Sequence, residues 1–187
     1  MKSPTRFIIE PVGGQYVSTK NVGGQEIIMT TSIEEAKDVN RIGKILEIPL
    51  IYEGIAKEGD LCVVHHNVFR TTYDDKGYPK ESAFFIEENK FYVTEDLLYM
   101  VIRDGVKMPT EDNVFISPIE REDKWEGKVE ERHTGIVRYG NKTLEKYGVN
   151  EGNKIIFRKF NEYEFNIEGE RLYLMRANRI MAILQEN

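Results

Sequence analysis

Glu58-Gly-Asp-Leu-Cys-Val-Val64 recurs in the second half of the chain as Glu151-Gly-Asn-Lys-Ile-Ile-Phe157. In both stretches a glycine with an acidic or amide neighbour precedes a run rich in β-branched and apolar residues, which is typical of a turn that leads into a strand. A turn and strand that occur twice in a chain of 187 residues indicate an internal duplication.

The segments on either side of this unit recur as well, and in the same order. Both halves contain a strand that ends in proline, a strand that begins with glycine, a hairpin and a final apolar strand. The matched pairs are Arg6–Pro11 with Asn113–Pro118, Gly43–Glu47 with Gly135–Tyr139, Phe84–Val93 with Phe165–Leu174, and Asp96–Ile102 with Asn178–Leu184. Many short strands at close spacing predict an all-β protein, here two tandem copies of one small β-barrel, in domains 1–104 and 105–187.

The first copy contains two insertions, Asn21–Arg41 and Thr71–Ser82, and the second copy has the charged stretch Glu120–Thr134 in place of the first one. The 21–41 segment holds three apolar residues, Ile27-Ile28-Met29, behind the flexible pair Gly23-Gly24. These residues either return to the core of this protein or fit a groove on another protein. Because the second copy omits the segment, the fold does not require it, and we favour docking to a partner.

Composition and charge exclude several classes of function. The net charge of −6 argues against nonspecific binding of nucleic acid, which needs clustered lysine and arginine. No apolar run approaches the roughly 20 residues that span a bilayer, and a single cysteine, Cys62, fits a reducing compartment. We therefore expect a cytoplasmic protein that binds neither nucleic acid nor membranes.

Candidate chemical groups are few. Cys62 and His66 share one face of a predicted strand while His65 points to the other, and no second cysteine or histidine cluster accompanies them. We expect a buried cysteine and two partly exposed histidines rather than a metal site or a nucleophile. The stretch Glu120–Glu131 alternates acidic with basic residues and is expected to be a solvated loop. Trp125 within it either packs on the barrel or marks a contact between subunits.

The glycine pairs form no phosphate-binding motif, because neither a P-loop nor a strand–GxGxxG–helix unit is present. The sequence therefore predicts no enzyme activity, no catalytic residue and no cofactor.

Three stretches resemble the GroES-like co-chaperonin (chaperonin-10) family. Val149–Phe157 is similar to that family's "V-x-x-G-D-x-V-x-F" strand, and Ile167–Leu184 is similar to its C-terminal hairpin. Gly23–Met29 is similar to the "G-G-I-x-L" segment of the family's mobile loop. The stretches Pro49–Ala56 and Gly140–Tyr147, which replace the family's roof hairpin, are shortened in a way that resembles phage-encoded co-chaperonins.

The resemblance implies a function and a set of binding residues. The family forms rings that cap an ATP-bound chaperonin through one apolar loop per chain and thereby assist protein folding. Here the loop residues would be Gly23, Gly24, Ile27, Ile28 and Met29, and a ring of seven chains would match a seven-fold GroEL-like chaperonin. The alternative is a structural or assembly protein, of viral or other origin, that reuses the barrel without binding a chaperonin.

Overall fold

The computed structural model describes residues 2–15, 19–22, 25–28, 39–123, 127–158 and 163–184. The chain divides into two compact units, unit 1 (Met1–Val106) and unit 2 (Lys107–Asn187). Strands dominate both units, so the predicted all-β class is confirmed. None of the helices in the described ranges is long and apolar enough to cross a membrane.

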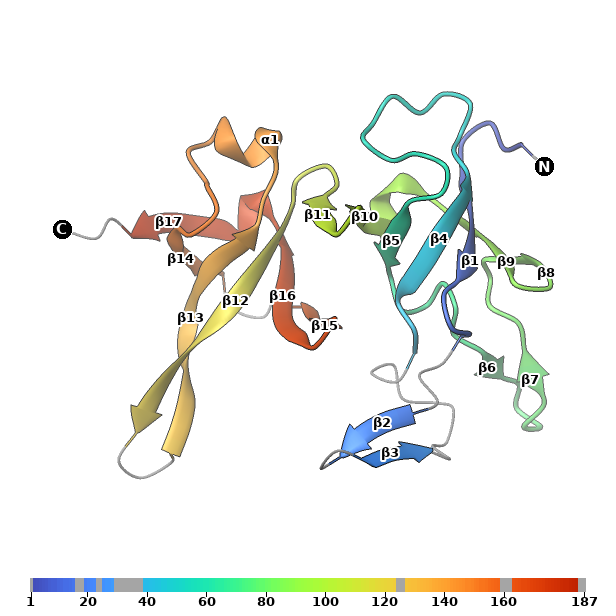
Figure 1. The fold of residues 1–187 in the computed structure, drawn as a ribbon, viewed down its shortest axis with the longest axis horizontal. Helices are drawn as coiled ribbons and strands as arrows, with labels where there is room; N and C mark the ends of the chain where they lie inside the picture. Colours follow the sequence, from blue (N-terminus) through green and yellow to red (C-terminus); the bar gives the residue numbers. More distant parts are fainter. Residues whose placement is uncertain are drawn as a thin grey trace. The chain divides into compact units, whose positions relative to one another are not determined.

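Unit 1 is built on a seven-stranded sheet (Figure 1). Its strand order is β11-β10-β5-β4-β1-β9-β8, and the division between the units falls within the edge strand β11. The bounds are β1 (Phe7–Pro11), β4 (Ile42–Glu47), β5 (Leu61–Val64), β8 (Phe85–Glu87), β9 (Lys90–Val93), β10 (Leu98–Arg103) and β11 (Val106–Pro109). The 3-10 turn η1 (Glu95–Leu97) leads into β10.

Each insertion of unit 1 contributes a separate two-stranded sheet. The first pairs β2 (Thr19–Val22) with β3 (Gln25–Ile28), and the second pairs β6 (Thr72–Tyr73) with β7 (Pro79–Lys80). At the tip of the second hairpin, the Asp74 carboxylate accepts hydrogen bonds from the backbone N–H groups of Lys76 (2.9 Å) and Tyr78 (2.8 Å). The sequence Asp74-Asp75-Lys76-Gly77 is typical of a hairpin tip, and the structure confirms this prediction.

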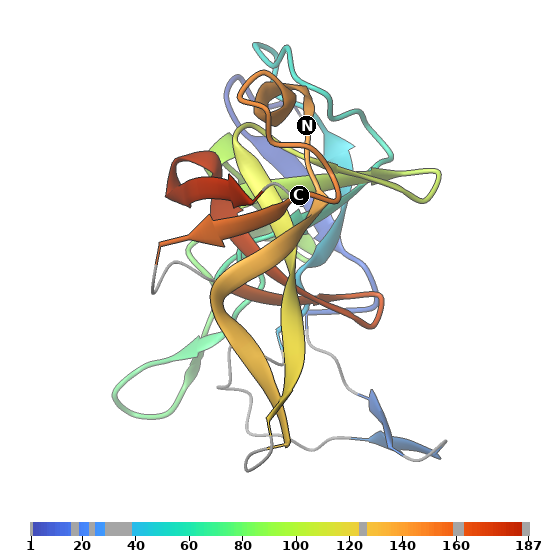
Figure 2. The same cartoon turned by 90° about the vertical axis from the view of Figure 1, so that its left-hand side faces the viewer.

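Unit 2 is built on a six-stranded sheet in the order β15-β16-β12-β13-β14-β17. The bounds are β12 (Asn113–Asp123), β13 (Gly127–Tyr139), β14 (Lys154–Phe157), β15 (Tyr163–Ile167), β16 (Glu170–Arg176) and β17 (Ile180–Leu184), with α1 at Lys142–Glu145 and the 3-10 turn η2 at Ala177–Arg179. Beyond the sheet, β12 and β13 continue as a two-stranded hairpin (Figure 2).

The six strands β8-β9-β1-β4-β5-β10 of unit 1 and β15-β16-β12-β13-β14-β17 of unit 2 follow the same order. Local details agree as well, because Pro11 pairs with Gly43 in unit 1 just as Pro118 pairs with Gly135 in unit 2. The turn glycines Gly59 and Gly152 both have positive φ, and each donates its N–H at 2.8 Å to the central strand of its own unit.

Each unit has its own core. In unit 1 the rings of Phe69 and Phe91 meet edge to face, with their centroids 5.1 Å apart, beneath the central strands. The core of unit 2 gathers around β12 and β14 and reaches Leu144, which lies fully buried on α1. Its members are Val114, Ile116, Val137, Leu144, Val149, Ile155, Phe157 and Met175.

Two local predictions are wrong. The β-branched and aromatic run Leu61–Phe69 predicts a single strand. In the structure this strand ends at Val64, and a turn follows in which Val68 N–H donates to the His65 carbonyl at 3.0 Å. The charged stretch Glu120–Glu131 is not a loop in its described part, because it belongs to the β12–β13 hairpin. Ser32 and Glu35 have the spacing of a capping box, which predicts one or two helical turns at 33–38. These residues and Trp125 lie outside the described residues.

Candidate functional site

The first candidate site is the place where the 21–41 segment leaves the sheet of unit 1. β1 and β4 are paired as far as Pro11 and Gly43, and Val12 N–H then donates to the Ile42 carbonyl at 3.0 Å. Beyond this point the two strands separate, so their backbone groups need other partners.

The side chain of Asn40 supplies these partners. Its Nδ2 donates to the carbonyls of Val12 and Gly14, both at 2.7 Å, and its Oδ1 accepts the Ile42 N–H at 2.9 Å. The Asn40 backbone N–H also donates to the Gln15 carbonyl at 3.0 Å. We call these contacts the Asn40 clamp. They join the two ends of the stretch that contains most of the predicted 21–41 insertion. We call this stretch, residues 16–39, the inserted segment.

The clamp is shielded from solvent. Asn40 is 9% exposed and its neighbour Val39 is 3% exposed, so the returning end of the inserted segment is anchored in the unit. The hydroxyl of Thr71 donates to the side-chain oxygen of Gln15 at 3.4 Å, which connects the departing end to the second insertion. The root of the inserted segment is therefore a defined structure.

Sequence analysis missed Asn40 as a functional candidate. An asparagine next to a long insertion is itself a signal, since its amide can hydrogen-bond nearby backbone groups that have lost their ladder partners. The sequence does not show which carbonyls the amide reaches, because these belong to residues some 26 to 28 positions earlier in the chain.

The predicted docking residues fall on the inserted segment. Ile27 and Ile28 lie on β3, where they pair with Lys20 and Thr19 of β2. Their strand is not part of the seven-stranded sheet. Gly23, Gly24 and Met29 lie outside the described residues. The docking role of all five residues stays a prediction.

In unit 2 the equivalent position is occupied by the β12–β13 hairpin. After Pro118–Gly135 the register of β12 and β13 shifts, and pairing resumes at Glu120–Glu130. His133 lies within this break and has a φ of 59°, in the left-handed region that few residues other than glycine adopt.

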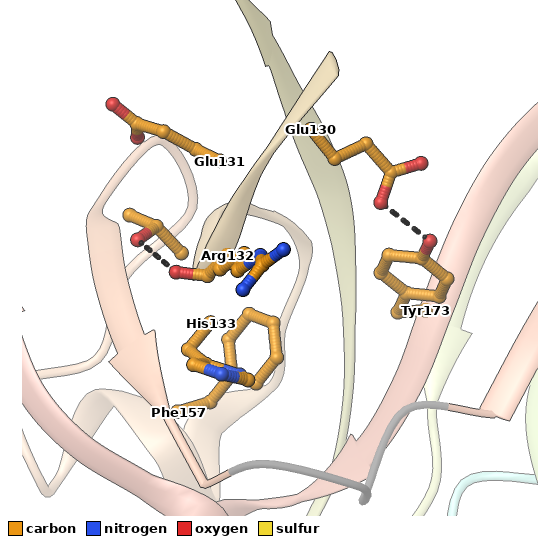
Figure 3. A pocket seen from close by; sticks show the side chains of 7 residues that line it. Glu130, Glu131, Arg132, His133, Phe157 and Tyr173 are labelled. Carbon is orange, nitrogen blue, oxygen red and sulfur yellow. Dashed lines mark hydrogen bonds between the residues drawn. The ribbon is translucent and has the colours of Figure 1, made fainter.

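A pocket of about 200 Å³ lies beside this break in register (Figure 3). Its lining includes consecutive residues of β13 together with Phe157 of β14 and Tyr173 of β16. The His133 and Phe157 rings are perpendicular, with their centroids 6.3 Å apart. The pocket therefore has an aromatic wall and a polar rim.

The carboxylates of this rim are already paired. Tyr173 donates its hydroxyl to Glu130 at 2.8 Å, Arg171 also binds Glu130, and Lys154 contacts Glu131 at 2.9 Å. Burial, together with the hydrogen bond to Glu130, raises the pKa of Tyr173 to about 12, so its hydroxyl stays protonated. These contacts connect the hairpin to β14 and β16, which is an architectural role.

Cys62, His65 and His66 do not have the arrangement that the strand prediction implied. Because β5 ends at Val64, the two histidines lie in the following turn, with their rings stacked at a centroid distance of 4.2 Å. Burial lowers the pKa of His65 and, together with the neighbouring charges, lowers that of His66 to about 4, so both are neutral at pH 7. Among the described residues, no group of three metal-ligating side chains is placed to hold an ion.

Comparison with known proteins gives one family match. Residues 100–184 match the model of the family described as the chaperonin 10 Kd subunit. The matched range contains the whole six-stranded sheet of unit 2. No curated protein matches the chain. The match supports the co-chaperonin family as the one to which this chain is related, through the second of its two units.

Proposed function

We propose that this protein is a co-chaperonin that caps an ATP-bound, GroEL-like chaperonin and assists protein folding. The observation that carries the proposal is the family match over residues 100–184. In this proposal the protein acts in the cytoplasm, carries out no catalytic step, uses no cofactor and forms a ring of identical chains, seven for a seven-fold chaperonin.

The proposal includes two tandem GroES-like barrels. The identical order of six strands in the two sheets supports it, as do the equivalent Pro11–Gly43 and Pro118–Gly135 pairs. The edge strands of the sheet are β11 and β8 in unit 1, and β15 and β17 in unit 2. Closure of each sheet into a barrel is therefore part of the proposal.

Docking would take place through the inserted segment, with Ile27 and Ile28 as its apolar contacts. Only unit 1 carries this segment, so each chain would offer one contact. Ordering a segment when it binds costs conformational entropy, which keeps a single contact weak. A ring of such contacts regains affinity because every contact after the first is intramolecular. Weak but numerous contacts allow release once the nucleotide is hydrolysed.

The substitution Ile28→Asp tests this proposal, because a carboxylate cannot be buried in an apolar groove at low cost. We expect it to abolish binding to a GroEL-like chaperonin with ATP, measured by co-sedimentation and by imaging end caps, while native mass shows an unchanged oligomer. Ile51→Asp is the matched control, since Ile51 is 72% exposed in unit 1 and lies outside the inserted segment. Wild-type protein that neither caps the chaperonin nor alters its ATPase would refute the proposal.

A further inference from the structure

We infer that Asn40 is a positioning residue for docking: it closes the root of the inserted segment and thereby sets the point from which Ile27 and Ile28 reach a partner. This inference rests on the proposed function, but the closure itself can be tested without a chaperonin. It assigns a role in docking to a residue outside the predicted docking set.

The clamp needs the chemistry of an asparagine. Its amide donates two hydrogen bonds, to Val12 and Gly14, and accepts one from Ile42, all between 2.7 and 2.9 Å. An aspartate has the same shape but would direct a carboxylate oxygen at two carbonyl oxygens, which repel it. A serine keeps only a single donor. At 9% exposure, water cannot readily replace the lost contacts.

Along the sequence, Ile27 and Ile28 lie at the middle of the segment that the clamp closes. Ile27 follows Gln15 by 12 residues, and Ile28 precedes Asn40 by 12 residues. The pairing of β2 with β3 brings the pair closer to the departing end, because Ile28 lies opposite Thr19, which follows Gln15 by four residues, and four extended residues span at most about 14 Å. The clamp therefore fixes the departing end a short way along the chain from the strand that pairs with Ile27 and Ile28.

Closure has an energetic consequence for docking. Bringing together the ends of a segment of this length costs entropy, and the fold of unit 1 meets that cost before any partner arrives. A partner that docks on the segment then does not have to meet the cost of that closure. When the clamp is open, the two ends are no longer held together, and the cost of bringing them together is added to the free energy of docking.

The main test is Asn40→Asp in the full chain, measured by binding to a GroEL-like chaperonin with ATP. We expect about a tenfold weaker apparent affinity, with an unchanged oligomeric mass. Hydrogen exchange should become at least tenfold faster at the Asn40 and Ile42 amides, which is a direct readout of the open root. Asn40→Ser, which is milder, should give an intermediate loss and covers the case in which Asn40→Asp does not fold.

The matched control is Asn141→Asp in unit 2. Asn141 also donates from Nδ2 to a backbone carbonyl, that of Glu111 at 2.8 Å, and it caps α1 by accepting the N–H groups of Thr143 and Leu144. Aspartate keeps this cap but loses the Nδ2 contacts. The control should lower the melting temperature and leave chaperonin affinity unchanged, because it lies outside the inserted segment.

Three results would overturn the inference: wild-type affinity in Asn40→Asp, an equal loss of affinity in Asn141→Asp, or unchanged exchange at Asn40 and Ile42. Wild-type protein that binds no chaperonin would refute the proposed function. If hydrogen exchange at the root still rises in Asn40→Asp, the conclusion that Asn40 closes the root would nevertheless stand. The two failures are therefore distinguishable.

Discussion

Cys62 lies in β5 between Gly43 of β4 and Val101 of β10, with no exposed surface. Burial raises the pKa of its thiol to about 12, since a thiolate would lose its hydration in this environment. The side chain therefore behaves as a small apolar residue of the core. The sequence-based expectation of a buried cysteine is confirmed, whereas the neighbouring histidines lie in a turn that the run of β-branched residues did not reveal.

This environment predicts that the Cys62 thiol resists alkylation in the folded protein. With a pKa near 12, only about one thiol in ten thousand is ionised at pH 8, and reagent has no access to it. Labelling by iodoacetamide should follow the unfolded fraction, rising with urea in parallel with the loss of circular dichroism. Fast labelling without denaturant would contradict the buried placement.

At the scale of elements, the close packing around Gly43 of β4 and Gly135 within β13 explains why glycine recurs at this position. A Cβ added at Gly135 would lie 2.9 Å from Ile116 Cδ1 and 3.0 Å from the Ser117 carbonyl oxygen. At Gly43 the corresponding contacts are 3.1 Å to Ile9 Cδ1 and 3.2 Å to the Glu10 carbonyl oxygen. At Gly135 the cross-strand neighbours would have to shift to admit a side chain, and at Gly43 they would have to give by a few tenths of an ångström.

Gly135→Ala should therefore destabilise unit 2 by about 1–3 kcal/mol, a typical cost of overpacking against a fixed backbone. Urea unfolding would measure the change, and hydrogen exchange should assign it to β12 and β13. The double variant Gly135→Ala/Ile116→Val removes the Cδ1 contact but not the carbonyl contact, so it should recover only part of the loss after correction for Ile116→Val alone. Full stability in Gly135→Ala would show that the strands can separate at this point.

The sequence predicted the strands that bury β-branched and aromatic residues, because burial leaves a pattern. It did not predict that β12 and β13 extend through charged residues, where cross-strand contacts such as Lys128 to Glu120 at 3.4 Å replace apolar packing. It also missed a one-residue shift between the units. Ile9 pairs with Phe91, whereas its match Ile116 pairs with Tyr173, although the repeat aligns Phe91 with Leu172.

At the scale of the whole molecule, the turns that precede β5 and β14 are equivalent, but the key side chain is a charged Asp60 in unit 1 and a neutral Asn153 in unit 2. In unit 1, Asp60 accepts the Lys57 N–H at 2.7 Å and is held by both Nε (2.7 Å) and Nη2 (2.6 Å) of Arg103. In unit 2, Asn153 makes the equivalent backbone contact to Asn150 at 2.8 Å without a charge. The Arg103 guanidinium holds the pKa of Asp60 below its usual value, although burial opposes this shift.

Asp60→Asn should keep the turn and lose the ion pair, lowering the unfolding free energy by about 1–2 kcal/mol at pH 7, since Arg103 remains partly exposed. Because the folded pKa of Asp60 is lowered, its contribution is complete above the unfolded value near 4 and disappears as pH falls through the folded value. Wild type and variant should therefore converge in stability at acidic pH. Urea unfolding across pH 2–7 would measure this, and a constant difference would contradict it.

The proline–glycine pairs at Pro11–Gly43 and Pro118–Gly135 mark a boundary in each unit. On one side lies a frame of strands that both units share, and on the other side lies an extension that differs between them. Past one pair the chain carries an inserted segment closed by Asn40, and past the other it carries a charged hairpin, yet the strand order behind both is identical. For a protein engineer these pairs are splice points. A foreign recognition peptide grafted between Gln15 and Asn40 would inherit a closed root, and a β-hairpin epitope would extend β12 and β13 in register.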